Sequence, residues 1–157
     1  MKYLYIVTDI DGVWTDGGMY YDEKGNEFKK FNTRDGMGVE LLNNEGIETI
    51  ICTGENSNAV KTRAEKLKIK NVFIGIRNKK EFLSNFFEKN NIDLKTVAYL
   101  GDDVNDIDAM NMVELTGCPS DAMKKVKDQV DIVCCKKGGE GVFREFAELI
   151  MDKNNEK

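Results

Sequence analysis

The chain has 157 residues, of which 41% are hydrophobic and 32% are charged, and its formal net charge is −5. This length suits one domain with a buried core, and the acidic balance argues against nucleic acid as a partner. No apolar run approaches the ~20 residues of a membrane span, and no signal peptide precedes the first predicted strand, so we expect a cytoplasmic protein without membrane contact.

The chain contains no histidine, and its four cysteines lack the spacing of a metal site. The absence of histidine excludes Ser-His-Asp and Cys-His catalysis and every metal site built on imidazole. We expect the cysteines to be free thiols. Any catalysis must therefore use carboxylates, lysine, hydroxyl groups and a metal ion held by oxygen.

The first predicted strand ends in two aspartates. An apolar, β-branched run over residues 4–7 predicts a strand buried on both faces, and Asp9 and Asp11 follow it. Side chains of extended chain alternate with a period of two, so both carboxylates leave the backbone on the same side. Gly12 lets the chain turn away without covering the spot. An acidic turn after an edge strand is the alternative interpretation of this pair alone.

Residues 17–32 predict a β-hairpin that leaves the main sheet as a flap. Two short runs with aromatic residues, 19–21 and 27–31, surround a turn signal at residues 22–26.

Helices and strands alternate along the rest of the chain. Predicted helices cover 35–44, 56–68, 78–90, a short stretch after Asp106, a segment capped by Pro119 and Ser120, and 142–151. Predicted strands lie in 47–52, 69–75, 96–100, 115–118 and 130–135. This alternation indicates an α/β fold, a Rossmann-like three-layer sandwich with a central parallel sheet. We expect one domain over residues 1–157 with a frayed tail at 152–157.

Three predicted strands end in polar residues. Asp9 and Asp11 follow the first strand, Thr53 the second and Asp102 the fourth. The carboxyl ends of parallel strands share one edge of the sheet, where ligand sites of open α/β sheets occur. Carboxylates there suit Mg²⁺, which prefers oxygen ligands and binds phosphate substrates. A carboxylate can also attack phosphorus, so Asp9 would be the nucleophile and Asp11 the acid and base.

Thr53 and Lys79 would complete such a site. Thr53 offers a hydroxyl and a backbone N–H to phosphoryl oxygens, and Lys79 offers a positive charge at a helix start. Phosphoryl transfer needs mainly positioning and charge neutralisation, so these few groups suffice. Taken singly, Thr53 would be a helix cap and Lys79 a solvated charge.

Four separated motifs resemble those of the haloacid dehalogenase superfamily of phosphatases. They are DIDGVWTDG, Thr53-Gly54, Lys79, and Gly101-Asp102-Asp103 with Asp106. The resemblance implies a HAD-like fold with Asp9 as nucleophile, Asp11 as general acid/base, Thr53 as phosphate contact and Lys79 as the lysine of the third motif. It also implies that Mg²⁺ is held by Asp9, Asp102 and the backbone carbonyl of Asp11, with Asp103 and Asp106 behind these ligands.

The motif spacing leaves no room for a cap domain. Only 42 positions separate Asp11 from Thr53, and 26 separate Thr53 from Lys79. An uncapped site would be open to water, so we expect the hairpin to pack against another subunit and roof it.

Nearly the whole chain resembles the capless branch that contains the 3-deoxy-octulosonate 8-phosphate phosphatases and their nine-carbon relatives. The resemblance rests on residues 12–38 and on KKGGEGVFREF at 136–146. It implies a homotetramer whose hairpins associate and whose neighbouring subunits line each other's sites.

Glu55 departs from the octulosonate enzymes, which usually carry arginine after the Thr-Gly pair. The pattern TGE, with Lys66 on the next helix, resembles the 2-keto-3-deoxynonulosonate 9-phosphate phosphatases. A carboxylate accepts hydrogen bonds from sugar hydroxyls, and a lysine pairs with the substrate carboxylate. Both residues could instead be solvated surface charges. Further candidates for substrate binding are Thr33, Asp35 and Arg63.

These observations predict a Mg²⁺-dependent phosphatase that forms an aspartyl phosphate. Its expected substrate is a small sugar-acid phosphate, the nine-carbon 2-keto-3-deoxynonulosonate (KDN) 9-phosphate, with N-acetylneuraminate 9-phosphate as a further candidate. The eight-carbon octulosonate 8-phosphate is the alternative. A phosphoreceiver domain uses similar residues but places its phosphorylated aspartate after a later strand. A non-catalytic module that assembles a sugar-nucleotide synthetase is a third interpretation.

Overall fold

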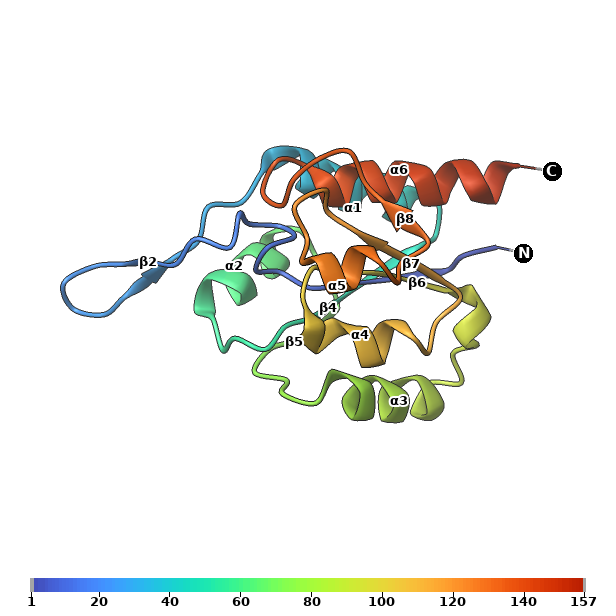
Figure 1. Ribbon diagram of the computed structural model, residues 1–157, viewed down its shortest axis with the longest axis horizontal. Helices are drawn as coiled ribbons and strands as arrows, with labels where there is room; N and C mark the ends of the chain where they lie inside the picture. The colour runs from blue at the N-terminus through green and yellow to red at the C-terminus, as the bar shows by residue number, and fades with distance from the viewer. Residues whose placement is uncertain (1, 157) are drawn as a thin grey trace.

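The predicted alternation of strands and helices forms a six-stranded parallel sheet in the computed structural model, which describes residues 2–156 (Figure 1). The strand order is β5-β4-β1-β6-β7-β8, so the first strand lies inside the sheet between β4 and β6. The strands are β1 (Tyr5–Thr8), β4 (Glu48–Cys52), β5 (Asn71–Phe73), β6 (Val97–Leu100), β7 (Leu115–Cys118) and β8 (Ile132–Val133).

Helices cover both faces of the sheet. One face packs against α1 (Thr33–Asn44), α2 (Asn58–Lys66) and α6 (Val142–Asn155). The other packs against α3 (Lys79–Lys89), α4 (Val104–Met110) and α5 (Lys124–Lys127), and a short 3₁₀ helix, η1 (Leu94–Thr96), precedes β6.

Alternation within the strands explains the two layers of core. In β1, Ile6 faces the α1 and α6 side, and Val7 faces the α3 and α4 side. Because both faces are covered, successive residues are buried in the central strands, from Ile6 to Thr8 in β1 and throughout β6. The Rossmann-like α/β sandwich that the sequence predicts is therefore confirmed, and one domain over 1–157 stays our prediction.

The hairpin forms as predicted from β2 (Tyr20–Tyr21) and β3 (Glu27–Phe28), which pair antiparallel. It extends away from the body of the molecule (Figure 1), and Tyr20, Tyr21 and Phe28 are exposed on it. Between β1 and β4 lie only this hairpin and α1, and between β4 and α3 only α2 and β5. Residues 2–156 thus contain no cap domain, as the motif spacing predicts.

Two expectations about the C-terminal third were wrong. Pro119 and Ser120 do not cap a helix, because α5 begins at Lys124 and Met123 precedes it without a side-chain cap. Residues 152–155 are not a frayed tail but the last turn of α6. Asn154 holds that turn, since its side chain accepts a hydrogen bond from the Tyr3 N–H at 2.7 Å and donates to the Tyr3 carbonyl at 2.9 Å. Residue 157 lies outside the described chain.

The cysteines are free, and three of the four are buried, as expected. Within residues 2–156 no helix has the length and apolar character needed to cross a membrane.

Candidate active site

The polar strand ends meet because three neighbouring strands finish level with one another. Thr8, the last residue of β1, pairs with Ile51 of β4 and with Leu100 of β6. The residues that follow these strands therefore share one edge of the sheet. They surround a cavity of about 490 Å³, whose wall includes Asp9, Asp11, Thr53 and Asp102.

Asp9 presents one carboxylate oxygen to the protein and leaves the other free. Its Oδ1 accepts a hydrogen bond from the Ile10 N–H at 2.8 Å and lies 3.1 Å from the Lys79 ammonium. No hydrogen bond from the described residues reaches Oδ2. Asp9 can therefore attack an electrophile through Oδ2 while Oδ1 holds its orientation.

Lys79 lies beneath Asp9 as a buried cation. It is the first residue of α3, which Asn78 caps, and only 2% of it is exposed. Its ammonium contacts Asp9 Oδ1 at 3.1 Å and Asp106 Oδ1 at 2.7 Å. Burial alone would lower the pKa of Lys79, but the two carboxylates raise it above its ordinary value. Lys79 is therefore charged throughout the physiological pH range.

Asp106 uses both of its oxygens to hold other groups of the site. Its Oδ1 accepts hydrogen bonds from Lys79 and from the Tyr99 hydroxyl, at 2.7 and 2.8 Å. Its Oδ2 accepts from the backbone N–H groups of Asp102 and Asp103, at 3.1 and 3.4 Å. Asp106 thus fixes the loop that carries Asp102, and it stands behind that residue as predicted from the motif order.

Sequence reasoning placed Tyr99 only in a core strand and missed this contact. A tyrosine that is wholly buried needs a partner for its hydroxyl, and Asp106 supplies it. A polar tip in an otherwise apolar strand, just before Gly101-Asp102, was the available signal. Asp103 begins α4, where it forms a capping box with Asp106.

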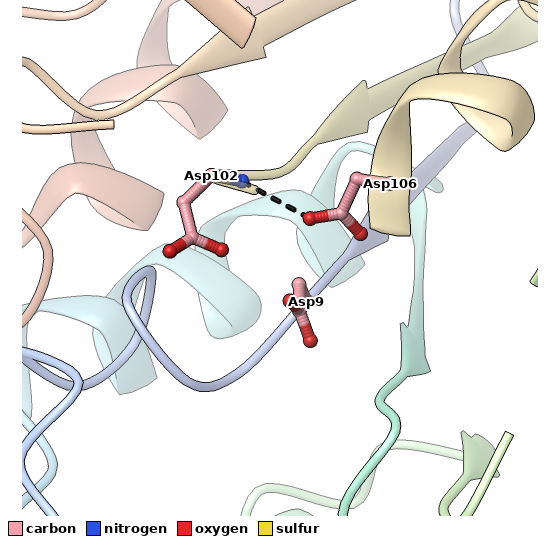
Figure 2. A group of neighbouring side chains, drawn as sticks. All are labelled: Asp9, Asp102 and Asp106. Carbon is pink, nitrogen blue, oxygen red and sulfur yellow. Dashed lines mark hydrogen bonds between the residues drawn. The ribbon is translucent and has the colours of Figure 1, made fainter. Parts of the chain in front are cut away.

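A group of three carboxylates can accept a divalent cation here. Asp9, Asp102 and Asp106 offer oxygens that all lie within 4.8 Å of one another, and the three side chains come from the residue directly after β1, the loop after β6 and α4 (Figure 2). Asp102 Oδ1 is buried without a hydrogen-bond partner among the described residues, so it lacks the positive group that it needs. Both oxygens of Asp106 are already occupied. The donor set therefore fits Mg²⁺ held by Asp9 and Asp102.

Gly12 is required where the chain passes this group. Its φ is +82°, and a Cβ atom there would lie 1.9 Å from Asp102 Oδ2. Any other side chain would displace the Asp102 carboxylate, so Gly12 leaves the space that a metal ion needs.

Crowding of carboxylates changes their proton affinity. Burial, followed by repulsion from Asp106, raises the pKa of Asp9 to about 7. Burial, followed by repulsion from Asp9, raises the pKa of Asp102 to about 8. A divalent cation would relieve this repulsion and favour the ionised forms.

We expect Mg²⁺ to raise the melting temperature more at pH 8 than at pH 6. The pKa values of Asp9 and Asp102 in the folded chain, about 7 and about 8, exceed the ordinary value of 3.8. The folded state thus keeps protons that the unfolded chain loses, so metal-free stability falls as the pH rises from about 4 to about 8. For each proton that Mg²⁺ displaces, the apparent affinity of the protein for Mg²⁺ rises about tenfold with each unit of increasing pH. Calorimetry at both pH values, with Asp102→Asn as control, measures this, and equal shifts at both pH values would contradict it.

Asp11 is held by a residue that the sequence did not single out. Its Oδ1 lies 2.6 Å from the ammonium of Lys29, which also lies 2.9 Å from Glu27 Oε1. Burial works to lower the pKa of Lys29, but the hydrogen bonds that its ammonium donates to Asp11 and Glu27 raise it overall. Side chains alternate along an extended strand, so residues 27 and 29 lie on the same side of the hairpin. This spacing was the available signal in the sequence.

Thr53 differs from expectation in one respect. Its backbone N–H donates to the Phe73 carbonyl at 3.0 Å, and its carbonyl accepts from the Ile76 N–H at 3.0 Å. The expectation that this N–H contacts a phosphate was therefore wrong, because the N–H already joins two strand ends. The hydroxyl of Thr53, on the cavity wall, is the group left for a ligand.

The predicted substrate-binding residues do not all meet at this cavity. Glu55 lies on its wall, whereas Thr33, Arg63 and Lys66 lie outside it, on α1 and α2. The structure does not bring these three residues to the cavity wall, and their role in substrate binding stays a prediction.

Asp35, another of the further candidates, has a structural contact instead. It is fully buried, and it accepts a hydrogen bond from the Arg144 N–H at 3.0 Å. This bond caps the start of α6, where Gly141 has no side chain to do so. Burial raises the pKa of Asp35 to about 6.

The wall of the cavity is strongly acidic. It carries seven carboxylates and, among the described residues, no lysine or arginine; the seven are Asp9, Asp11, Asp16, Glu55, Asp102, Asp103 and Asp121. Asp16 and Asp121 were not among the predicted site residues. An anionic ligand in this cavity needs positive charge to offset these carboxylates, and Lys79 behind Asp9 supplies part of it.

Comparison with known proteins places this arrangement in a recognised group. Residues 76–146 match the haloacid dehalogenase-like hydrolase family. The chain is 33% identical over 147 residues to the 3-deoxy-D-manno-octulosonate 8-phosphate phosphatase of Haemophilus influenzae, which covers 94% of this chain and 82% of that protein. It is 36% identical over 146 residues to the enzyme of the same name from Escherichia coli, covering 93% and 78% of the two chains.

A solved structure shows the same fold. The 3-deoxy-D-manno-octulosonate 8-phosphate phosphatase of Moraxella catarrhalis was crystallised with a magnesium ion, a phosphate ion and a KDO molecule. It superposes on this chain with a TM-score of 0.94 and 32% identity, over 98% of this chain and 88% of that one.

Proposed function

The chain belongs to the haloacid dehalogenase-like hydrolases, on the branch of the 3-deoxy-D-manno-octulosonate 8-phosphate phosphatases, and we propose that it releases phosphate from a 3-deoxy sugar acid phosphate of this class. It is a phosphoric monoester hydrolase, and Mg²⁺ is its cofactor. The observation that carries the proposal is the gathering of Asp9, Thr53 and Asp102 around one cavity, with Lys79 behind Asp9.

The proposed reaction runs through Asp9 and Asp11. Asp9 Oδ2 attacks phosphorus, and the bond to the sugar oxygen breaks as Asp11 gives that oxygen a proton. Asp11 then takes a proton from water, which attacks the aspartyl phosphate and restores Asp9. Thr53 and Lys79 orient and neutralise the phosphoryl oxygens. Mg²⁺, held by Asp9, Asp102 and the Asp11 carbonyl, would neutralise the remaining charge.

Two substrates have support from different observations. The relatives favour the eight-carbon 3-deoxy-D-manno-octulosonate 8-phosphate, because two of them carry that name at 33% and 36% identity. Glu55 favours the nine-carbon KDN 9-phosphate or N-acetylneuraminate 9-phosphate, because it replaces the usual arginine and lies on the cavity wall. A carboxylate there accepts hydrogen bonds from the longer chain of hydroxyls. We place the eight-carbon substrate first.

We expect the kcat/KM for octulosonate 8-phosphate to exceed that for either nine-carbon phosphate by about tenfold or more. Phosphate release with Mg²⁺ measures this for the parent and for Glu55→Gln, with Glu65→Gln as control because Glu65 is exposed on α2 away from the cavity. A preference for a nine-carbon substrate that Glu55→Gln abolishes would reverse the order of the two candidates.

A homotetramer would supply the cations that one chain lacks. The substrate carries a phosphate and a carboxylate, yet the cavity wall is acidic, and Arg63 and Lys66 lie outside it. The hairpin exposes Tyr20, Tyr21 and Phe28, which suits contact with another subunit. We infer that neighbouring subunits complete each other's sites, and light scattering would measure the assembly. A cytoplasmic location stays a prediction.

The alternatives of another class have less support. The relatives are phosphatases, and the nucleophile position, the acid/base position and the metal ligands are all present. Neither a phosphoreceiver domain nor a non-catalytic assembly module is favoured by a particular observation.

A further inference from the structure

Lys29 is a lysine shielded from solvent at the base of the hairpin. It directly follows β3, and its side chain has no exposed surface. Its ammonium lies between two carboxylates, 2.6 Å from Asp11 Oδ1 and 2.9 Å from Glu27 Oε1. A charge removed from water is tolerated only with such partners, so Asp11 and Glu27 together hold the Lys29 ammonium in this place.

The contact leaves the two oxygens of Asp11 in different states. Oδ1 is occupied by Lys29, whereas Oδ2 is buried and has no hydrogen-bond partner within residues 2–156. A buried carboxylate oxygen without a donor is costly in free energy, so it marks a place where a ligand or water supplies one. Oδ2 is therefore the oxygen of Asp11 that is available to exchange a proton.

A further contact anchors Lys29 from the other side. Glu27 Oε1 also accepts a hydrogen bond from the Ser57 hydroxyl at 3.2 Å. Ser57 is buried and caps α2, whose start follows the loop that carries Thr53 and Glu55. The chain of contacts from Asp11 through Lys29 and Glu27 to Ser57 thus ties the base of the hairpin to two loops of the active site.

We propose that Lys29 is a positioning residue for the phosphatase reaction, which holds Asp11 through Oδ1 so that Oδ2 transfers the proton in both steps. In the first step the Oδ2 proton passes to the sugar oxygen as its bond to phosphorus breaks and the bond to Asp9 forms. In the second step a water proton passes to Oδ2 as the water oxygen bonds to phosphorus and the bond to Asp9 breaks. The proposal rests on the proposed roles of Asp9 and Asp11.

The test compares Lys29→Met with Lys30→Met in the full chain. Lys30 is the exposed neighbour, so its variant controls for the loss of one hairpin charge. We expect Lys29→Met to lower kcat for the preferred sugar-acid phosphate by about 100-fold, the usual contribution of an oriented acid or base, with KM changed less than about threefold. Lys30→Met should match the parent, and Lys29→Arg should recover part of the loss.

A second readout separates positioning from structural damage. The leaving group of p-nitrophenyl phosphate needs no proton, so Lys29→Met should still release about one nitrophenolate per active site in a burst. Slow turnover should follow, because water must then be activated by Asp11. A Lys29→Met enzyme with parent kcat, or one that loses the burst together with kcat, would overturn the proposal. If Lys29→Met does not fold, Lys29→Gln is measured under the same criteria. Activity of the parent itself tests the proposed function separately.

Discussion

Asp9→Asn should lower phosphate release by more than about 10,000-fold, as loss of a nucleophile does in enzymes that form covalent intermediates. Oδ2 of Asp9 has no hydrogen bond from the described residues and is the oxygen that we propose attacks phosphorus. An amide nitrogen in its place is not nucleophilic. The remaining amide oxygen still accepts the hydrogen bond that Ile10 donates to Oδ1 at 2.8 Å, so the loop after β1 keeps its shape.

The same substitution should leave the protein folded. Burial raises the pKa of Asp9 to about 7, which shows that the site disfavours its charge in the metal-free protein. A neutral amide removes that cost, so we expect an unchanged or higher melting temperature without Mg²⁺. Phosphate release and calorimetry measure both effects. Asp108→Asn, at an exposed position on α4, is the control and should behave as the parent. Activity above about 1% of the parent would remove Asp9 from its assigned role.

Lys79→Met should reduce both activity and stability. Lys79 is 2% exposed, and its ammonium contacts Asp9 at 3.1 Å and Asp106 at 2.7 Å. Removing one partner of a buried ion pair leaves the other charge unpaired, at a cost of about 3–5 kcal/mol in the free energy of unfolding. Loss of a fixed cation beside the phosphoryl group should also lower kcat by about 1,000-fold.

The pH dependence of the free energy of unfolding tests whether the lost ion pair causes the destabilisation of Lys79→Met. The raised pKa of Lys79 stabilises the fold at every pH below its unfolded value of 10.5, so the parent has this contribution throughout the neutral range. In Lys79→Met the Asp9 carboxylate, whose pKa burial already raises to about 7, can relieve its repulsion with Asp106 by binding a proton, so the deficit in stability should be smaller at pH 5 than at pH 8. Urea unfolding at both pH values measures it.

Two further variants make this result specific. Lys80→Met changes an exposed neighbour on the same helix and should shift the free energy of unfolding by less than about 0.5 kcal/mol. Lys79→Met combined with Asp106→Asn should recover part of the stability, because the variant then buries one charge fewer. A single Lys79→Met variant as stable as Lys80→Met at both pH values would show that Lys79 is not an essential buried partner.

The acidic cavity explains why assembly and catalysis belong together in this proposal. Seven carboxylates on the wall repel an anionic substrate, and no lysine or arginine of the described chain lies on that wall. Mg²⁺ and Lys79 would offset part of this charge, and we propose that a neighbouring subunit supplies the rest through residues such as Arg63. We also propose that Glu55, on the cavity wall, selects the sugar hydroxyls.

The sequence by itself determined the layers of the fold and the position of the reacting groups. Periodicity of apolar residues specifies strands buried on both faces, and polar residues directly after Thr8, Cys52 and Gly101 must lie at one edge of a parallel sheet. Four motifs in a fixed order then indicated the chemistry. These inferences depend only on residues close in sequence and on the geometry common to all parallel sheets.

Only the tertiary structure decided which groups hold the reacting residues. Lys29 reaches Asp11 across 18 positions and Asp35 caps a helix 109 positions away, so neither contact follows from local propensity. The structure also showed that the Thr53 N–H is already bonded to Phe73. A buried charge or N–H takes whichever partner the packing brings within about 3 Å, and that distance is set by the whole fold rather than by neighbouring residues.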